Sequence, residues 1–261
     1  MSGKLFVVGF GPGDEKNMTF WARDCIEKSN VVIGYETYID LIRHLLDGKE
    51  VIETGMTEEI DRAKMAVEKA QSGNIVSIVS SGDAGIYGMA ALIYEILLES
   101  GWRPGMNPDV EVVPGITSAS ACAALVGSPL SLDFAVVSMS DLLVPWELIE
   151  KRVRAAAAGD FVIVIYNPLS KKRTWQLQKT RDIIMEYRSP DTPVAVIKSA
   201  FREGQKIKVT TLKDMPNAEN LGMLTTIIVG NSTTTYKNGI MLTPRGYSSK
   251  YTVPDFSSII G

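Results

Sequence analysis

The sequence predicts an α/β fold, and three observations carry that prediction. Short apolar runs of strand length alternate with segments of helical period along the 261 residues. Glycine bounds many of these runs, and a helical segment leads from one run to the next, which is typical of strands joined by crossover helices. Hydrophobic residues make up 45% of the chain, so a sizeable core can be buried. We therefore expect much parallel sheet covered by helices.

The strand and helix signals follow one another in a regular order. The apolar runs that predict strands are 4–9, 30–34, 50–53, 75–80, 109–113, 134–138, 160–165, 193–198 and 224–229. The segments that predict helices are 18–28, 57–72, 87–99, 116–126, 146–158 and 173–187. Two further stretches, 205–212 and 223–242, look like antiparallel strands and hairpins. The second half of the chain is therefore expected to add antiparallel strands.

The chain is long enough for two modest domains. The break is expected near 115–130, around the turn-rich stretches PGITSAS (114–120) and GSPLSLD (127–133). We predict an N-terminal α/β domain over 1–117 and a C-terminal α/β domain over 118–242. The tail, 243–261, carries few helix or strand signals.

Composition excludes several classes of protein. The two cysteines, Cys25 and Cys122, are too few for a disulfide framework or an iron–sulfur cluster, and we expect both thiols to be buried. A single histidine, His44, argues against a multi-histidine metal site and against a Ser-His-Asp triad, so no metal is expected. The net charge of −3 does not suggest a nucleic-acid binder. No apolar run approaches the roughly 20 residues of a membrane span, and the start of the chain does not resemble a signal peptide, so we expect a cytoplasmic protein.

The stretch GFGPGD, residues 9–14, follows the first apolar run. A dinucleotide loop needs G-x-G-x-x-G, but Asp14 fills its third glycine position and Pro12 lacks a backbone donor. Phosphate binding is therefore disfavoured. Two interpretations stay open: a tight turn between strand and helix, or a glycine-lined wall against which a flat or uncharged ligand lies.

Two more loops favour the ligand wall. SSGDAGIYG, residues 80–88, follows another apolar strand and places Asp83 where open α/β sheets bind ligands. VPGITSA, residues 113–119, leads from a strand into a helix, and its Thr117 and Ser118 could cap that helix or bind a ligand. Three such loops fit S-adenosylmethionine, which has a sulfonium cation and no phosphate.

These loops together resemble the tetrapyrrole methyltransferase family. GFGPGD, GDAGIYG and PGITSAS match its G-x-G-P-G-D, G-D-P-x-x-Y-G and P-G-I-T motifs in order, with Ala84 in the usual place of proline. The resemblance spans residues 4–235. It implies two α/β domains with an S-adenosylmethionine cleft between them. The residues that it places against the cofactor are Pro12, Gly82, Asp83, Ile86, Thr117 and Ser118 in the first domain, and Asn167, Ala200, Thr225 and Thr226 in the second.

A narrower resemblance concerns SMSDLLVPW, residues 138–146, and YNPLSKKRT, residues 166–174. Both are similar to segments of the branch that methylates C17 of a precorrin macrocycle in cobalamin biosynthesis and contracts the ring. This resemblance implies catalytic roles for Ser138 and Asp141, and a contact of Ser140 with the macrocycle. Glu36 matches the place of a base that is proposed in uroporphyrinogen methylases. The histidine that is common before the SLSD segment is absent, and Leu132 and Asp133 stand there.

The expected substrate is a macrocycle with many carboxylate arms. From Phe161 to Arg181 there is no Asp or Glu, and the basic group Lys171, Lys172 and Arg173 follows the YNP turn. These three side chains either bind substrate carboxylates or belong to an ordinary solvated helix start. The expected assembly is a homodimer that binds neither membrane nor nucleic acid.

Other functions stay open at this point. A sister methylase would act on C11, C20 or C2/C7 of the same macrocycle. An RNA or diphthamide-precursor methylase could use the same fold, and a non-catalytic adenosyl-binding module or an oxidoreductase is a further alternative. Whether the substrate carries cobalt is also open.

Overall fold

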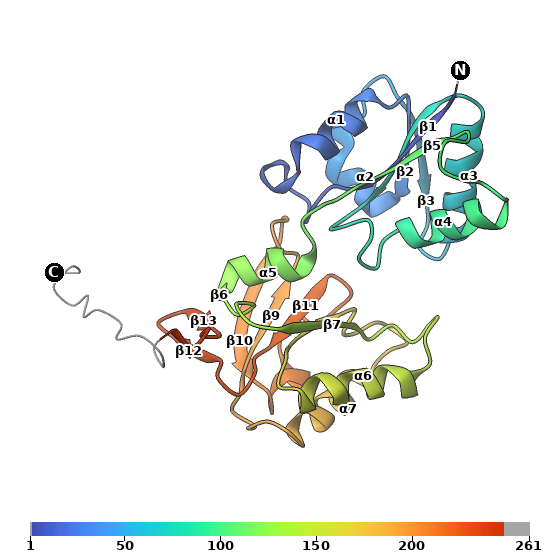
Figure 1. Cartoon of the computed structure of the whole chain (residues 1–261). Coiled ribbons are helices and arrows are strands. Elements are labelled where there is room, and N and C mark those ends of the chain that lie inside the picture. Colours follow the sequence, from blue (N-terminus) through green and yellow to red (C-terminus); the bar gives the residue numbers. More distant parts are fainter. Residues whose placement is uncertain (1, 248–261) are drawn as a thin grey trace, which may run out of the picture. The chain divides into compact units, whose positions relative to one another are not determined.

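The computed structural model describes residues 2–247, which form two compact units (Figure 1). Unit 1 runs to Ala121 and also includes Ala200–Glu203. Unit 2 contains Cys122–Ser199 and the chain from Gly204 onward. The greater part of the predicted tail 243–261 lies outside the described residues.

Unit 1 is built on a five-stranded sheet in the order β3-β2-β4-β1-β5. Its strands are β1 (Lys4–Gly9), β2 (Val31–Tyr35), β3 (Glu50–Thr54), β4 (Ile75–Ser80) and β5 (Asp109–Val113). All of its strand pairs are parallel. Because every strand runs the same way, the loops that leave the five strands lie along one edge of the sheet.

Helices cover both faces of this sheet (Figure 1). They are α1 (Phe20–Lys28), α2 (Glu36–Ile42), α3 (Glu59–Gln71) and α4 (Ala90–Glu99). Strand alternation turns Leu5 and Val7 toward α3 and α4, and turns Phe6 and Val8 toward α1 and α2. Two short 3₁₀ turns, Glu15–Asn17 and Arg43–Leu45, complete the unit.

Unit 2 contains a mixed five-stranded sheet in the order β10-β9-β11-β8-β7. The strands are β7 (Phe134–Ser138), β8 (Val162–Tyr166), β9 (Pro193–Lys198), β10 (Lys206–Thr211) and β11 (Thr225–Val229). β7 and β8 are parallel, whereas β11 runs antiparallel to both β8 and β9. A 3₁₀ turn, Met215–Asn217, lies between β10 and β11.

One face of the unit 2 sheet packs against α6 (Trp146–Ala158) and α7 (Gln176–Met185), which share its hydrophobic core. On the other face, the Cys122 thiol of α5 (Ser118–Val126) contacts the Thr226 hydroxyl of β11. A small second sheet joins β12 (Thr235–Lys237), β13 (Ile240–Leu242) and β6 (Gly127–Ser128).

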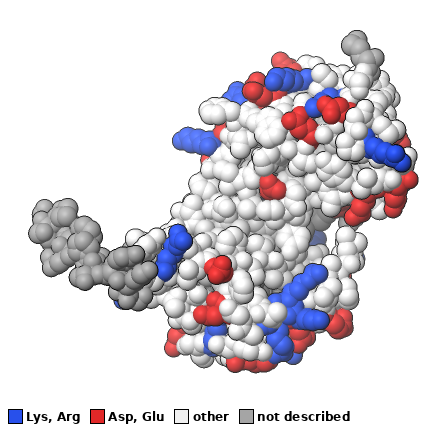
Figure 2. Space-filling model, in the orientation of Figure 1, with Lys and Arg blue, Asp and Glu red and all other residues white. Residues whose placement is uncertain are grey.

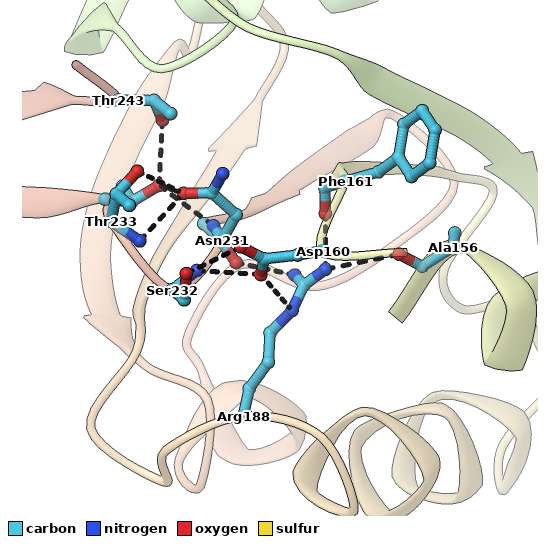
Figure 3. Close-up of polar contacts among 10 residues, drawn as sticks. Ala156, Asp160, Phe161, Arg188, Asn231, Ser232, Thr233 and Thr243 are labelled. Carbon is cyan, nitrogen blue, oxygen red and sulfur yellow. Dashed lines mark hydrogen bonds and ion pairs between the residues drawn. The ribbon is translucent and has the colours of Figure 1, made fainter. Parts of the chain in front are cut away.

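A polar junction centred on Arg188 ties the amino end of β8 to the end of β11 (Figure 3). The buried Arg188 guanidinium donates to the carbonyl of Gly230 at 2.6 Å, to that of Ala156 at 3.4 Å and to that of Phe161. Asp160 lies 3.8 Å from Arg188 Nε and accepts from Ser232 N at 2.9 Å and Ser232 Oγ at 2.6 Å. These contacts lie at the end of the sheet opposite to the carboxyl end of β8.

The predicted α/β fold class is confirmed, as is each predicted strand, within two residues at its ends. Helices begin up to three residues later than predicted, because the residues before them form turns or caps; Thr19, for instance, caps α1 by accepting from Ala22 N at 3.0 Å. The short helix α2 was not predicted. Both cysteines are buried free thiols, as predicted. Within residues 2–247, none of the helices has the length and apolar character that a bilayer span requires.

Candidate functional site

In unit 1, the loops after β1, β4 and β5 meet at the carboxyl edge of the sheet. These three strands are neighbours, with β1 between the other two. β1 leads to α1 on one face, whereas β4 leads to α4 on the opposite face. The chain therefore leaves two adjacent strands in opposite directions, which is the switch point where open α/β sheets bind ligands.

The glycines of these loops bring three backbones together. Gly11 and Gly82 form a reciprocal pair, with Gly11 N 3.0 Å from Gly82 O and Gly82 N 2.7 Å from Gly11 O. A Cβ on Gly9 would lie 2.7 Å from Gly82 O, and one on Gly115 would come closer still to the same carbonyl. Only glycine at positions 9 and 115 permits this close approach.

Gly82 has a different role from its neighbours. Its φ is +73°, and a Cβ there would meet nothing nearer than Thr117 Cα at 3.9 Å. The missing side chain therefore leaves open space beside the turn at 116–118. A ligand that lies along this turn meets backbone instead of a side chain.

Asp83 holds two of the loops in register. Its Oδ1 accepts from Gly85 N at 2.8 Å and Ile86 N at 3.1 Å, and its Oδ2 accepts from Gly115 N at 3.0 Å. The carboxylate is partly exposed, and the side chain of Ile86 beside it is 42% exposed. Asp83 thus fixes the loop and presents a negative charge at the switch point.

The first loop lacks the features of a phosphate site. The Asp14 side chain accepts from Asn17 N at 3.0 Å and from Asn17 Nδ2 at 2.6 Å, so it caps the 3₁₀ turn. Pro12 is buried and offers no N–H. The prediction against phosphate binding therefore agrees with the geometry.

Arg202 joins this loop cluster from a segment remote in sequence. Its Nε donates to the carbonyl of Pro12, and its Nη2 donates to Ser81 Oγ. Ser81 Oγ in turn lies 3.5 Å from Gly11 O. Burial lowers the pKa of the Arg202 guanidinium from its ordinary value, and Tyr38 partly offsets this shift.

Aromatic rings from the segment after β1, the end of β2 and helix α2 contact one another. The Tyr38 ring meets the rings of Tyr35 and Phe10 edge to face, at centroid distances of 5.2 and 6.2 Å. The buried guanidinium of Arg62 lies 6.0 Å from the Tyr35 ring centroid and donates to Thr54 Oγ1 at 2.5 Å. Glu36 follows Tyr35 and is exposed to solvent at the start of α2.

In unit 2, strand register gathers the predicted residues at one sheet edge. Ser138 pairs with Tyr166, so Asn167 follows at the same edge. Since β11 is antiparallel, its first residue, Thr225, lies opposite Lys198 at the end of β9. Asn167 has a φ of +52°, which turns the chain sharply out of β8.

Arg173 connects three segments of this edge. Its Nη1 donates to Asn167 O at 3.0 Å, its Nη2 to Ser140 Oγ at 3.1 Å, and its Nε lies 3.5 Å from Asp141 Oδ1. The Asn167 amide donates to Ser138 Oγ at 3.0 Å. The Arg173 side chain is only 11% exposed, and its Nη1 and Nη2 donate to groups of the protein itself.

Asp141 is held by a residue that the sequence did not reveal. Gln176 Nε2 donates to Asp141 Oδ2 at 2.8 Å, and this hydrogen bond, with smaller help from Arg173, lowers the pKa of the Asp141 carboxyl. Lys171 and Lys172 are exposed on the adjoining loop. This edge therefore combines a fixed carboxylate with two exposed ammonium groups.

The threonines of β11 use their side chains within the protein. Thr225 is buried and donates to Asn220 O at 2.8 Å, while Thr226 contacts the Cys122 thiol. Ala200 belongs to the segment counted with unit 1, between Ser199 and Phe201, which both have positive φ. Any ligand contact from these three predicted residues must therefore come mainly from backbone or methyl groups.

The structure thus groups Pro12, Gly82, Asp83, Ile86, Thr117 and Ser118 at the unit 1 edge. Separately, it groups Ser138, Ser140, Asp141, Asn167 and Arg173 at the unit 2 edge. Sequence reasoning missed Arg202 and Gln176. The one available signal for Arg202 was its place two residues after the predicted Ala200.

The three glycine loops and the fold can be compared with known protein families. The family model for tetrapyrrole (corrin/porphyrin) methylases matches residues 4–216. The chain therefore belongs to the tetrapyrrole methylase family, as its three glycine loops predicted.

Particular relatives are named more narrowly. A cobalt-factor III methyltransferase of Priestia megaterium is 51% identical over 97% of this chain. A probable cobalt-factor III C(17)-methyltransferase of Salmonella typhimurium is 44% identical over 94% of this chain and 99% of its own length. The crystal structure of the methyltransferase CobJ matches 93% of this chain and 100% of that chain, with a TM-score of 0.86 and 35% identity. The chain spans about half of the Priestia protein, 47% of its length.

Proposed function

We propose that this protein transfers a methyl group from S-adenosylmethionine to C17 of a precorrin-type macrocycle in cobalamin biosynthesis, with contraction of the ring. The observation that carries the proposal is the glycine-walled switch point of unit 1, which suits an adenosyl compound without phosphate. The names of the relatives point to the same position on the macrocycle.

The residues of unit 1 fit the proposed donor. The open space beside Gly82 would be filled by a single Cβ, so a flat group can lie against the backbone there. Asp83 places a carboxylate at the same edge, which suits a ligand with a sulfonium cation and an ammonium group. Pro12, Ile86, Thr117 and Ser118 are the proposed neighbours in unit 1, and Asn167, Ala200, Thr225 and Thr226 are those proposed from the second half.

The donor supplies an electrophilic methyl on a positively charged sulfur. What remains for the protein is to place the two reactants in line and to exclude water. Asp83 and the glycines hold the donor loops rigid through backbone hydrogen bonds. A rigid cradle keeps the distance to the acceptor carbon short.

The unit 2 edge is the proposed acceptor side. Ser138, Ser140 and Asp141 offer hydroxyl and carboxylate groups that Arg173 holds in place. Lys171 and Lys172 are free to meet the carboxylate arms of the macrocycle as mobile charges. Arg173 acts as a positioning residue for the serines, and Glu36 is a proposed proton acceptor that solvent can reach.

The proposal is tested with the purified chain, S-adenosylmethionine and either cobalt-factor III or metal-free precorrin-3B. We expect product mass to rise by one methyl and product absorbance to report the contracted ring with one of the two acceptors. The acceptor that reacts also decides whether the substrate carries cobalt. Unchanged mass with both acceptors, under conditions in which a known relative is active, contradicts the proposal.

The proposed assembly is a homodimer in the cytoplasm, as the family resemblance implies. Light scattering of the purified chain tests the assembly directly. A mass equal to a single 28.5 kDa chain at micromolar concentration contradicts it.

A further inference from the structure

Within residues 2–247, the structure gives Arg202 contacts with neutral oxygens and no ion pair. Among the described residues, Tyr38 is the one titratable side chain whose charge acts on the pKa of the Arg202 guanidinium, and the partners that the guanidinium contacts are the neutral oxygens of Pro12 and Ser81. The side chain is only partly exposed. A partly desolvated charge that lacks an opposite charge is costly, and proteins retain one where a ligand supplies the counter-charge.

Two hydrogen bonds fix the orientation of the Arg202 guanidinium. Nε and Nη2 are engaged with the loops after β1 and β4, while Nη1 takes part in neither contact. The aliphatic stem lies against Gly13, where a Cβ would come within 2.9 Å of Nε and 3.0 Å of Cγ. Glycine at this position therefore gives the guanidinium its place beside both donor loops.

Other arginines of unit 1 are compensated differently. Arg23 and Arg43 form ion pairs with Glu27 and Asp40 at 2.7 and 2.6 Å. The buried Arg62 has Glu59 and Glu58 close enough to raise its pKa, in opposition to the burial that lowers it. For Arg202, no carboxylate in the described part of the chain acts on the pKa in this way, although Arg202 lies at the switch point where the ligand is expected.

We propose that the guanidinium of Arg202 binds a carboxylate of a small-molecule ligand at the carboxyl edge of unit 1. The inference rests on the proposed function, which offers two sources of that group. One is the amino-acid carboxylate of the methyl donor, and the other is a carboxylate arm of the acceptor macrocycle. Guanidinium recognises either by charge-assisted hydrogen bonds.

Binding measurements separate the two sources. Calorimetry compares S-adenosylhomocysteine, which has the carboxylate, with 5′-methylthioadenosine, which has the adenosine and thioether without the amino-acid end. Fluorescence quenching compares uroporphyrin, with eight carboxylates, and coproporphyrin, with four. The proteins are the wild-type chain, Arg202→Gln and the matched control Arg103→Gln, which alters an exposed arginine of the same unit.

If the donor supplies the carboxylate, Arg202→Gln binds S-adenosylhomocysteine roughly 10- to 100-fold more weakly than wild type and methylthioadenosine equally well. If the acceptor supplies it, the loss falls on the porphyrins and is greater for uroporphyrin. Arg103→Gln is expected to match wild type throughout. Equal affinity of Arg202→Gln and wild type for all four ligands overturns the inference, and so does an equal loss on methylthioadenosine and S-adenosylhomocysteine with porphyrin binding unchanged.

A direct readout on the wild-type chain guards against a variant that fails to fold. The ¹⁵Nε resonance of Arg202, assigned by its absence in Arg202→Lys, should shift on saturation with the carboxylate ligand and stay in place with methylthioadenosine. A resonance that no carboxylate ligand moves overturns the inference. Wild-type protein that binds neither the donor product nor a porphyrin overturns the proposed function as well, so the two failures are distinguishable.

Discussion

The glycines at the switch point divide into two kinds by what surrounds the absent side chain. At Gly115 a Cβ would press on the carbonyls of Gly82 and Gly9, so glycine is required by packing. At Gly82 a Cβ would reach only ordinary contact distance, 3.9 Å from Thr117 Cα, so packing does not require glycine there, whereas the φ of +73° favours it. Substitution separates these roles.

Gly115→Ala is expected to lower the free energy of unfolding by about 1–3 kcal/mol, because three backbones must move apart. Gly82→Ala is expected to cost about 1–2 kcal/mol of backbone strain and to weaken S-adenosylhomocysteine binding at least tenfold. Gly105→Ala is the control for strain alone, since its φ is +91° and no atom lies within 4 Å. Urea unfolding and calorimetry provide the two measurements. Donor affinity unchanged in Gly82→Ala contradicts the assignment of this space to the ligand.

The pKa of the Cys122 thiol reports on the burial of one face of α5. Burial raises the pKa of its thiol to about 12, although the Thr226 hydroxyl opposes the shift. An unfolded thiol ionises near pH 9, so between pH 9 and pH 12 the folded state holds a proton that the unfolded state releases. Stability therefore falls as pH rises through this window.

The expected loss for Cys122 is about 1.4 kcal/mol between pH 9.5 and pH 10.5, measured by urea unfolding as the difference between wild type and Cys122→Ala. The alanine variant removes this titration and leaves the other groups in place. Parallel pH profiles of the two proteins would show that the thiol is not buried as the structure has it.

Some residue roles were predictable and others were not. Glycine-rich loops that follow apolar strands predict a switch point. The apolar run and the glycines are both visible within a short stretch of sequence. The contacts of Arg202 with Pro12 and of Gln176 with Asp141 join residues that are distant in sequence. Nothing in a one-dimensional pattern distinguishes these side chains from ordinary surface residues.

At the scale of elements, the loop between β8 and α7 carries a side chain that holds the polar groups of the unit 2 edge in place. Arg173 lies in this loop and binds the turn after β8 and the segment after β7, while Gln176 opens α7. Asp141 is thus held from the first turn of a helix. The pKa of Asp141 reports whether that helix start is in place.

Gln176→Leu removes the leading cause of the lowered Asp141 pKa, so the pKa should rise toward its ordinary value. The ¹³C resonance of the Asp141 carboxyl gives the titration midpoint. A carboxyl with a lowered pKa stabilises the fold at neutral pH, and this contribution is lost as pH falls through the folded-state pKa. Gln178→Leu alters an exposed residue of the same helix and should leave the midpoint unchanged. A midpoint unmoved in Gln176→Leu would refute the contact.

The Arg188 junction joins the amino end of β8 to the end of β11, at the end of the unit 2 sheet opposite to the proposed site (Figure 3). Arg188→Met removes the hydrogen bonds of the guanidinium to three carbonyls, of which Ala156 O keeps a second donor in Phe161 N, and should lower the free energy of unfolding by about 3 kcal/mol. Arg152→Met, on the exposed face of α6, should change it by less than about 0.5 kcal/mol. Equal effects of the two variants on urea unfolding argue against a structural role for this junction.

Element types were predictable because the strands are dense in Val and Ile and glycine marks their ends. The helix α2 was missed because its seven residues offer fewer than two turns of periodic pattern. The antiparallel pair β12–β13 falls within 223–242, where hairpins were predicted. The pairing of β13 with β6 joins segments that are distant in sequence, and such pairing leaves no local signal.

At the scale of the whole molecule, each unit carries a group of the proposed site residues at one edge of its sheet. On the face shown in Figure 2, acidic and basic side chains are interspersed on both units. The unit 1 edge offers carbonyls, the Asp83 carboxylate and the Arg202 guanidinium, whereas the unit 2 edge offers hydroxyls, the Asp141 carboxylate beside Arg173, and two ammonium groups. This division matches a donor and an acceptor of different chemistry.

The fold class and family were predictable from the order of three motifs. The inclusion of Ala200–Glu203 in unit 1 was not predictable, because the chain crosses back for only a few residues. That short segment carries Arg202, so the candidate site includes a residue that lies outside the three glycine-loop motifs.

The central claim is methyl transfer to C17, and a donor with a ¹³C-labelled methyl group tests it most directly. After reaction with the acceptor that is consumed, itself prepared with ¹³C in the macrocycle, the NMR spectrum of the purified product should contain one enriched methyl, with its carbon–carbon coupling to C17. Label on C11, on C20 or on C2 or C7 would assign the protein to a sister reaction, and a product without label would contradict the account.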